Sequence, residues 1–148
     1  MRYKISFLIV SLCLSITIYA QQTSAPENTI SDLIGLTLDE LFGRFGIPQS
    51  VHAVRGLESW QDDVVLVYAD TDFYMYRNRV WQVGVKSAYG FKIGDTINQA
   101  AQRLGAGIKY YDDYFLYTLP GRGWPMMLRV NVDKSQLVSA IFIYRSDL

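Results

Sequence analysis

The sequence predicts an α+β fold made of two tandem repeats, each a short helix followed by antiparallel strands. Residues 34–46 return 59 positions later as residues 93–105, and both segments read Ile-Gly-x-Thr, then a helical stretch, then Gly. Each segment is followed by short alternating apolar and polar runs rich in aromatic and β-branched residues, which is typical of strands. A fixed spacing of this size indicates a duplicated supersecondary unit. We therefore expect one sheet with short helices packed on one face.

The two helices are predicted from their ends. Thr37 is a candidate N-cap, and Glu40 stands three residues later, as a capping box requires. Thr96 and Gln99 repeat the arrangement in the second segment. Apolar residues at helical spacing follow each cap, and a glycine ends each segment. Helices this short are not stable alone, so each must lie on a sheet.

Alternating runs predict four strands in each repeat. We expect a tight turn at residues 78–79 and a second turn at residues 133–136. Alternation also predicts that Trp81, Val83 and Val85 lie together under the helices. The expected strands are residues 51–55, 64–69, 73–76 and 80–86, then 108–111, 114–118, 126–132 and 137–145.

The N-terminus predicts export. Arg2 and Lys4 precede an apolar run at residues 5–18, and Ala20 precedes a polar segment, as in a secretory signal peptide cut after Ala20. An uncleaved anchor is one alternative, although the run is shorter than the roughly 20 apolar residues of a membrane span. A lipoprotein modified at Cys13 is another.

Removal of residues 1–20 would leave a chain with no cysteine and no membrane span. The remaining chain would contain twelve Lys and Arg residues and fourteen Asp and Glu residues. It has no run of basic residues that would suggest nucleic acid as a partner. The expected organisation is a signal peptide at 1–20, a flexible leader at 21–30, repeat 1 at 31–90 and repeat 2 at 91–148. Together the two repeats are expected to form one compact domain.

This order of elements resembles the β-lactamase inhibitory protein fold, and it is similar to the small lipoproteins of the outer-membrane barrel-assembly machinery. The resemblance rests on the doubled Gly-x-Thr helix motif and on residues 69–76, where an acid and aromatics follow a small turn. It implies that Asp72 inserts into a partner's cleft, with Phe73, Tyr74 and Tyr76 as aromatic contacts. Trp124 is matched to an aromatic residue of the inhibitor's second loop. The inhibitor has a disulfide in each repeat and the assembly lipoproteins have one unit and a lipidated cysteine, so this chain departs from both.

Strand alternation gives an independent prediction of a binding surface. Helices can cover only one face of the sheet, and tyrosine with arginine on the other face is typical of protein-binding surfaces. The alternative is that these aromatic residues complete a core. Trp124 has two interpretations of its own, an anchor that enters a partner's pocket or a side chain folded back over the sheet edge. The residues expected on the open face are Tyr74, Tyr76, Gln82, Arg129, Asn131, Phe142 and Tyr144.

Catalytic and metal-binding patterns are weak. His52 is the one histidine, and no serine or acid stands at a spacing that suggests a catalytic group. The acid pairs at residues 62–63, 70 with 72, and 112–113 match no calcium-binding loop. No glycine-rich phosphate loop is present in the sequence. We therefore expect no enzyme activity, no catalytic or metal site and no cofactor.

The prediction is an exported protein-binding module, periplasmic or secreted, that resembles the β-lactamase inhibitor. Its expected partner is another exported or envelope protein, either a hydrolase or a component of barrel assembly. The first alternative is a role in envelope or outer-membrane assembly. The second is an enzyme that uses His52.

Overall fold

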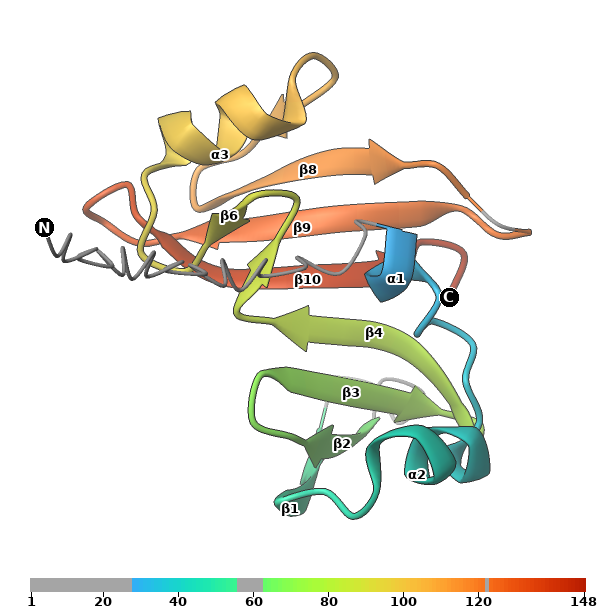
Figure 1. Ribbon diagram of the computed structural model, residues 1–148. Coiled ribbons are helices and arrows are strands. Elements are labelled where there is room, and N and C mark those ends of the chain that lie inside the picture. Colours follow the sequence, from blue (N-terminus) through green and yellow to red (C-terminus); the bar gives the residue numbers. More distant parts are fainter. Residues whose placement is uncertain (1–27, 56–62, 122) are drawn as a thin grey trace, which may run out of the picture.

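In the computed structural model, residues 28–55, 63–121 and 123–148 are described, and they confirm the α+β fold. The predicted signal peptide, residues 21–27 of the leader and Asp62 lie outside them. Three helices and ten strands follow one another along these residues. Figure 1 shows how they are arranged in space. Their bounds are α1 Asn28–Ser31, α2 Leu38–Phe45, β1 Ser50–Val54, β2 Asp63–Val67, β3 Thr71–Tyr76, β4 Arg79–Val85, β5 Ser87–Ala88, β6 Phe91–Lys92, α3 Ile97–Leu104, β7 Lys109–Tyr110, β8 Tyr114–Leu119, β9 Met126–Val132 and β10 Val138–Arg145.

Eight strands form one antiparallel sheet in the order β1-β2-β3-β4-β10-β9-β8-β7. Each repeat contributes four strands, and the last strand of each, β4 and β10, pair at the centre. The first strand of each repeat, β1 and β7, forms an outer edge. The two repeats are therefore related by an approximate two-fold relation centred between β4 and β10.

The Ile-Gly-x-Thr motif fastens each helix to the last strand of its own repeat. The Gly35 amide donates to the Val80 carbonyl over 2.7 Å, and the Val80 amide donates to the Leu36 carbonyl over 2.8 Å. In repeat 2, Gly94 and Val138 make the matching contact at 2.8 Å. Both glycines have φ near +90°, a conformation that L side chains rarely adopt. This backbone requirement explains why glycine stands at both positions.

Both predicted capping boxes are present. The Glu40 amide donates to Thr37 Oγ1, and Glu40 Oε2 accepts from the Thr37 amide at 2.8 Å. Thr96 and Gln99 form the same pair of bonds in repeat 2, also with 2.8 Å for the return bond. Each helix ends at its predicted glycine, whose amide donates a hydrogen bond to a backbone carbonyl in the last turn of the helix.

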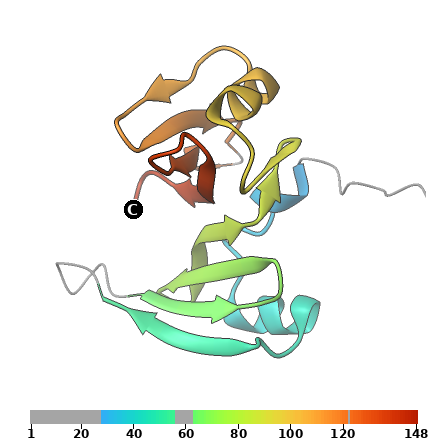
Figure 2. The same cartoon turned by 90° about the vertical axis from the view of Figure 1, so that its left-hand side faces the viewer.

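All three helices lie on one side of the sheet, and the opposite side is open (Figure 2). Leu41 of α2 and Ala100 of α3 are fully buried against the side of the sheet that the helices cover. The core beneath the helices contains side chains from both repeats, including Phe73 of β3 and Phe115 of β8. No helix among the described residues is long and apolar enough to cross a membrane.

Two local predictions were wrong. The turn between β3 and β4 is formed by Arg77 and Asn78, both with positive φ, rather than by residues 78–79. Trp81 does not lie under the helices, because β4 carries a β-bulge there: Gln82 pairs with Tyr74, whereas Val80 pairs with the next residue of β3. The extra residue turns Trp81 to the open face.

The bulge recurs in repeat 2, where β10 skips Ser139 between Val138 and Ala140. β2 and β8 are offset by 49 residues rather than 59, since Val65 and Tyr114 occupy matching register positions. Residues 28–31, partly in the expected leader, form α1, and the small β5–β6 hairpin was not predicted.

Candidate functional site

The open face of the sheet carries the predicted candidate site. Its centre is a register row that crosses four strands, with Asp72 opposite Gly84, Gly84 opposite Phe142, and Phe142 opposite Arg129. Directly opposed residues in antiparallel strands point to the same side, so these four positions share one surface. The structure therefore brings together residues from β3, β4, β10 and β9 that are up to 70 positions apart in the sequence.

Aromatic side chains occupy the middle of this face. Tyr74 meets Phe142 edge to face, with ring centroids 6.1 Å apart, and Trp81 meets Tyr144 in the same way at 6.5 Å. Such edge-to-face pairs hold rings in fixed orientations. All four side chains are half-buried although no helix covers them. They form a stiff apolar surface that is neither closed core nor fully solvated.

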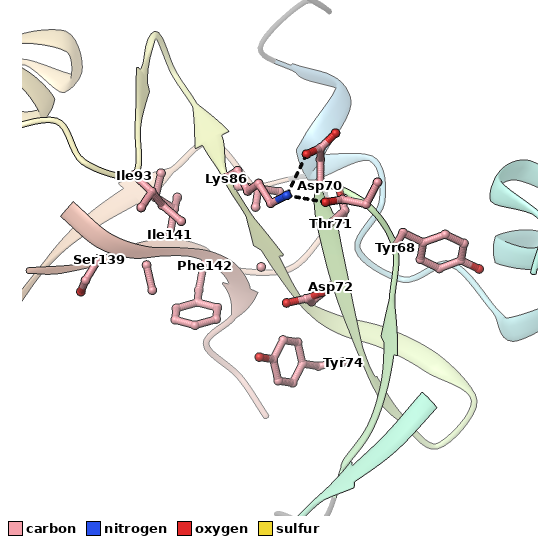
Figure 3. A pocket seen from close by; sticks show the side chains of 14 residues that line it. Tyr68, Asp70, Thr71, Asp72, Tyr74, Lys86, Ile93, Ser139, Ile141 and Phe142 are labelled. Atoms are coloured by element: carbon pink, nitrogen blue, oxygen red, sulfur yellow. Dashed lines mark hydrogen bonds and ion pairs between the residues drawn. The ribbon is translucent and has the colours of Figure 1, made fainter. Parts of the chain in front are cut away.

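Gly84 makes a hollow in this surface. A Cβ atom at Gly84 would lie 3.4 Å from the Phe142 ring and 3.6 Å from Asp72 Cβ, so a larger side chain would fill the space between them. A cavity of about 280 Å³ opens here, and the rings of Tyr74 and Phe142 border it with Asp72 (Figure 3). Lys86 at its rim pairs with Asp70 over 3.1 Å.

Charges of opposite sign flank the aromatic surface. Asp72 is half-buried, and no hydrogen bond or ion pair joins its side-chain carboxylate to another described residue. Arg129 donates through Nε to Asn131 Oδ1 at 2.8 Å and lies 4.0 Å above the Tyr114 ring, but no carboxylate among the described residues pairs with it. Three strand spacings separate the two charges, which is roughly 14 Å. Each charge is thus partly desolvated without an opposite charge to offset it.

The electrostatics of the two central tyrosines agree with this geometry. Burial raises the pKa of Tyr74 above its ordinary value of 10.0, and the carboxylates of Asp72 and Asp63 raise it further. Burial also raises the pKa of Tyr144, while the positive charge of Arg129 opposes that rise. Both hydroxyls are therefore neutral at physiological pH and can donate hydrogen bonds to a partner.

Six of the eight proposed contact residues lie on the open side. Phe73 was wrongly included: it is fully buried on the helix side, where its ring contacts Phe45 at 5.1 Å and Tyr68 at 5.5 Å. Strand alternation already places it opposite Asp72 and Tyr74. The six are Asp72, Tyr74, Tyr76, Arg129, Phe142 and Tyr144.

Trp124 is also separate from the open face. It packs against the core, and a Cβ atom at Gly35 would lie only 2.8 Å from Trp124 Cζ2. The Arg145 guanidinium also lies over its ring, 4.3 Å from the centroid. The folded-back interpretation therefore holds for Trp124, and the projecting anchor was wrong. Residue 122 of the same loop lies outside the described residues.

Three residues of the face were missed. Trp81 was not predicted on this face because a β-bulge leaves no clear signal in the sequence. Its Nε1 donates a hydrogen bond to Asp63 Oδ1 over 3.0 Å. Gly84 was missed because a glycine offers no side chain to list. Tyr114 could have been found, because it alternates with the buried Phe115.

The described residues hold no group of three or more metal-binding side chains. His52 is exposed on the edge strand β1, opposite Val65, and no hydrogen bond joins it to another described side chain.

Comparison with known proteins yields two structures and no family. No protein-family model and no curated protein matches the chain. An extracellular protein containing an SCP domain from Bacillus anthracis superposes with a TM-score of 0.54 at 12% identity, over 94% of this chain and 51% of its own. A DUF4309 family protein from Bacillus subtilis superposes with a TM-score of 0.50 at 14% identity, over 81% of this chain and 93% of its own.

At these identities the similarity shows the fold alone. The chain spans about half the length of the SCP-domain protein. Neither structure is described as a β-lactamase inhibitor or as a barrel-assembly lipoprotein. The resemblance drawn from the sequence therefore stays a prediction.

Proposed function

We propose that this protein is an exported, non-catalytic binding module that holds another exported protein on the open face of its sheet. The observation that supports this most strongly is the central row of the face. There, half-buried Asp72 and Arg129 lie on either side of an aromatic surface, and neither has an opposite charge to pair with.

Burying a charge without a partner costs free energy, so such positions are rare unless something else offsets the cost. A protein that places a basic group near Asp72 and an acidic group near Arg129 would offset both. Tyr74, Phe142 and Tyr144 between them would supply the apolar contact area, as aromatic residues do in the centres of interfaces. The face is thus suited to a partner with complementary charges about 14 Å apart.

Export of the module is supported by the signal-like N-terminus and by one structural neighbour that is described as extracellular. The resemblance to the β-lactamase inhibitory protein suggests a hydrolase as the partner. The resemblance to the assembly lipoproteins suggests an envelope barrel instead. The identity of the captured protein distinguishes the two.

The test uses three baits: the wild-type protein, the open-face variant Asp72→Arg/Arg129→Glu, and the control Asp39→Arg/Arg103→Glu. The control makes the same charge changes at exposed positions on the helices. Each bait is incubated with envelope and culture-supernatant extracts, and retained proteins are identified by mass spectrometry. We expect one protein to be retained by the wild type and the control but not by the open-face variant.

For that protein, Asp72→Ala and Arg129→Ala should each weaken binding about fivefold or more, which corresponds to about 1 kcal/mol. A soluble hydrolase would favour the inhibitor-like role, and a barrel or assembly component would favour the envelope role. Equal retention by all three baits would contradict the proposed face.

A further inference from the structure

The two edges of the sheet differ in a way that the open-face function does not use. β1 is a five-residue edge strand that, among the residues the structure describes, pairs only with β2, and all five of its side chains are exposed. β7 at the other edge has two residues, one of them Lys109. A free edge presents unpaired amide and carbonyl groups that can bond another strand, and proteins usually protect it with short strands, charges, prolines or bulges. β7 has such protection, whereas β1 contains no charged residue, proline or bulge.

Apolar side chains extend this unprotected edge on the helix side. Val51 of β1 shares a register row with Leu66 and Phe73, and Phe45 of α2 packs on Phe73. Val51 is 56% exposed, and Ile47 between α2 and β1 is 92% exposed. We call this set the apolar rim; it consists of Phe42, Phe45, Ile47, Val51 and Val64, all exposed.

The matching positions of repeat 2 are mostly smaller or more polar. Ala101 and Ala106 stand where repeat 1 has Phe42 and Ile47, and Asp113 stands where it has Val64. Leu104 replaces Phe45 and is less exposed, and Tyr110 replaces Val51. The fold itself therefore does not demand an exposed apolar rim at this place. A concentrated apolar surface beside a free strand edge marks an interaction site.

We propose that the β1 edge and the apolar rim bind a second copy of this chain, through antiparallel pairing of the two β1 strands. A two-fold axis at His52 would set each His52 opposite the other and Val51 opposite the second copy's Ala53. Both members of that last pair lie on the helix side, so the rims of the two copies would meet on the same side of a continuous sheet. Such an interface uses one patch twice, as cyclic dimers do.

Charge favours a second copy over an unrelated strand. Self-pairing of a strand usually fails where like charges come opposite each other, because such pairs are destabilising. Ser50, Val51, His52, Ala53 and Val54 carry no fixed charge, so antiparallel self-pairing opposes none. A second copy also brings an apolar rim to cover the first, whereas an added polar strand would leave both Ile47 and Val51 in water.

Sedimentation velocity on the full exported protein over a range of concentrations tests the proposal, with three variants. His52→Lys places like charges on the axis, and because His52 is exposed the variant should fold like wild type, which a urea unfolding curve checks. Tyr110→Lys makes a comparable change at the exposed β7 edge. Asp72→Arg disrupts the open face instead.

We expect a monomer–dimer equilibrium for the wild type, weakened about fivefold or more by His52→Lys and unchanged by the other two variants. A wild type that stays monomeric throughout would overturn the proposal. A dimer that His52→Lys does not weaken would also overturn the proposal. A dimer that Asp72→Arg abolishes would overturn it in favour of an interface on the open face.

Cross-linking gives an independent measurement. Residues opposite each other in antiparallel strands have Cα atoms about 4.5–5.5 Å apart, within the range that a disulfide spans. Under oxidising conditions His52→Cys should form a covalent dimer that reducing agent releases, and Tyr110→Cys should not. Equal cross-linking of the two variants would contradict pairing at β1.

Discussion

The two repeats share their backbone bonds and differ in the surfaces they present. In both, the Gly-x-Thr motif docks on the last strand, a capping box starts the helix, and a β-bulge interrupts that strand. Asp72 of repeat 1, however, corresponds to Arg129 of repeat 2, and Gly84 corresponds to Phe142. The shared bonds build the scaffold, and the substitutions between equivalent positions create the charged, hollowed face on which we base the function.

The largest effect should come from exchanging the two central helix residues. Leu41 and Ala100 hold equivalent, fully buried positions in α2 and α3. Leu41→Ala gives repeat 1 the smaller residue of repeat 2 and leaves a cavity, which should cost about 2–5 kcal/mol of unfolding free energy. Urea denaturation measures it.

The reverse change, Ala100→Leu, should overpack α3 and cost about 1–3 kcal/mol. If Leu41→Ala lost less than about 1 kcal/mol of unfolding free energy, Leu41 would not be packed in the core as the structure shows.

The paired glycines give the next comparison. Gly35 and Gly94 both have φ near +90°, so alanine at either position should be strained by about 1–3 kcal/mol. At Gly35 the added Cβ would also lie 2.8 Å from Trp124, whereas at Gly94 no other atom lies within 4 Å. Gly35→Ala should therefore destabilise more than Gly94→Ala in urea unfolding.

Replacing Trp124 with Leu should bring the penalty of Gly35→Ala closer to that of Gly94→Ala. Equal penalties for the two glycine variants in the wild-type background would show that Trp124 does not pack on Gly35.

The sequence predicted what local rules determine. The helix caps followed from Thr37, Glu40, Thr96 and Gln99. All eight strands of the sheet were placed within two residues at either end, in the correct order along the chain. Strand alternation places Phe73 and Tyr74 on opposite faces of the sheet, as the structure has them.

What failed depends on contacts that no short window contains. The bulge that turns Trp81 outward arises from pairing with β3, and the position of Trp124 depends on Gly35, almost 90 residues away in the sequence. The β4–β10 pairing that unites the open face also joins the ends of two repeats. Residue types could suggest a binding surface, but only the register shows which residues share it.

The smallest expected effect is a difference between the two capping boxes in how their contribution to the unfolding free energy depends on pH. Hydrogen bonds from Thr37 lower the pKa of Glu40 below its ordinary value of 4.5, and Gln99 at the equivalent place does not titrate. The ionised carboxylate is thus favoured in the folded state. It stabilises the protein above pH 4.5, and that contribution is lost as the pH falls through the folded-state pKa.

Glu40→Gln should remove this part of the pH dependence of the unfolding free energy, and Gln99→Glu should add a similar one to repeat 2. Thermal melts at pH 7 and pH 3 measure both. An unchanged difference between the two pH values in Glu40→Gln would contradict the role of the carboxylate.

The most direct test of the central claim is hydroxyl-radical footprinting of the protein with and without its captured partner. The account predicts lower modification of Tyr74, Phe142 and Tyr144 in the complex, with Trp124 and Tyr110 unchanged. Protection confined to Trp124 or Tyr110, with the three open-face rings modified as in the free protein, would contradict it.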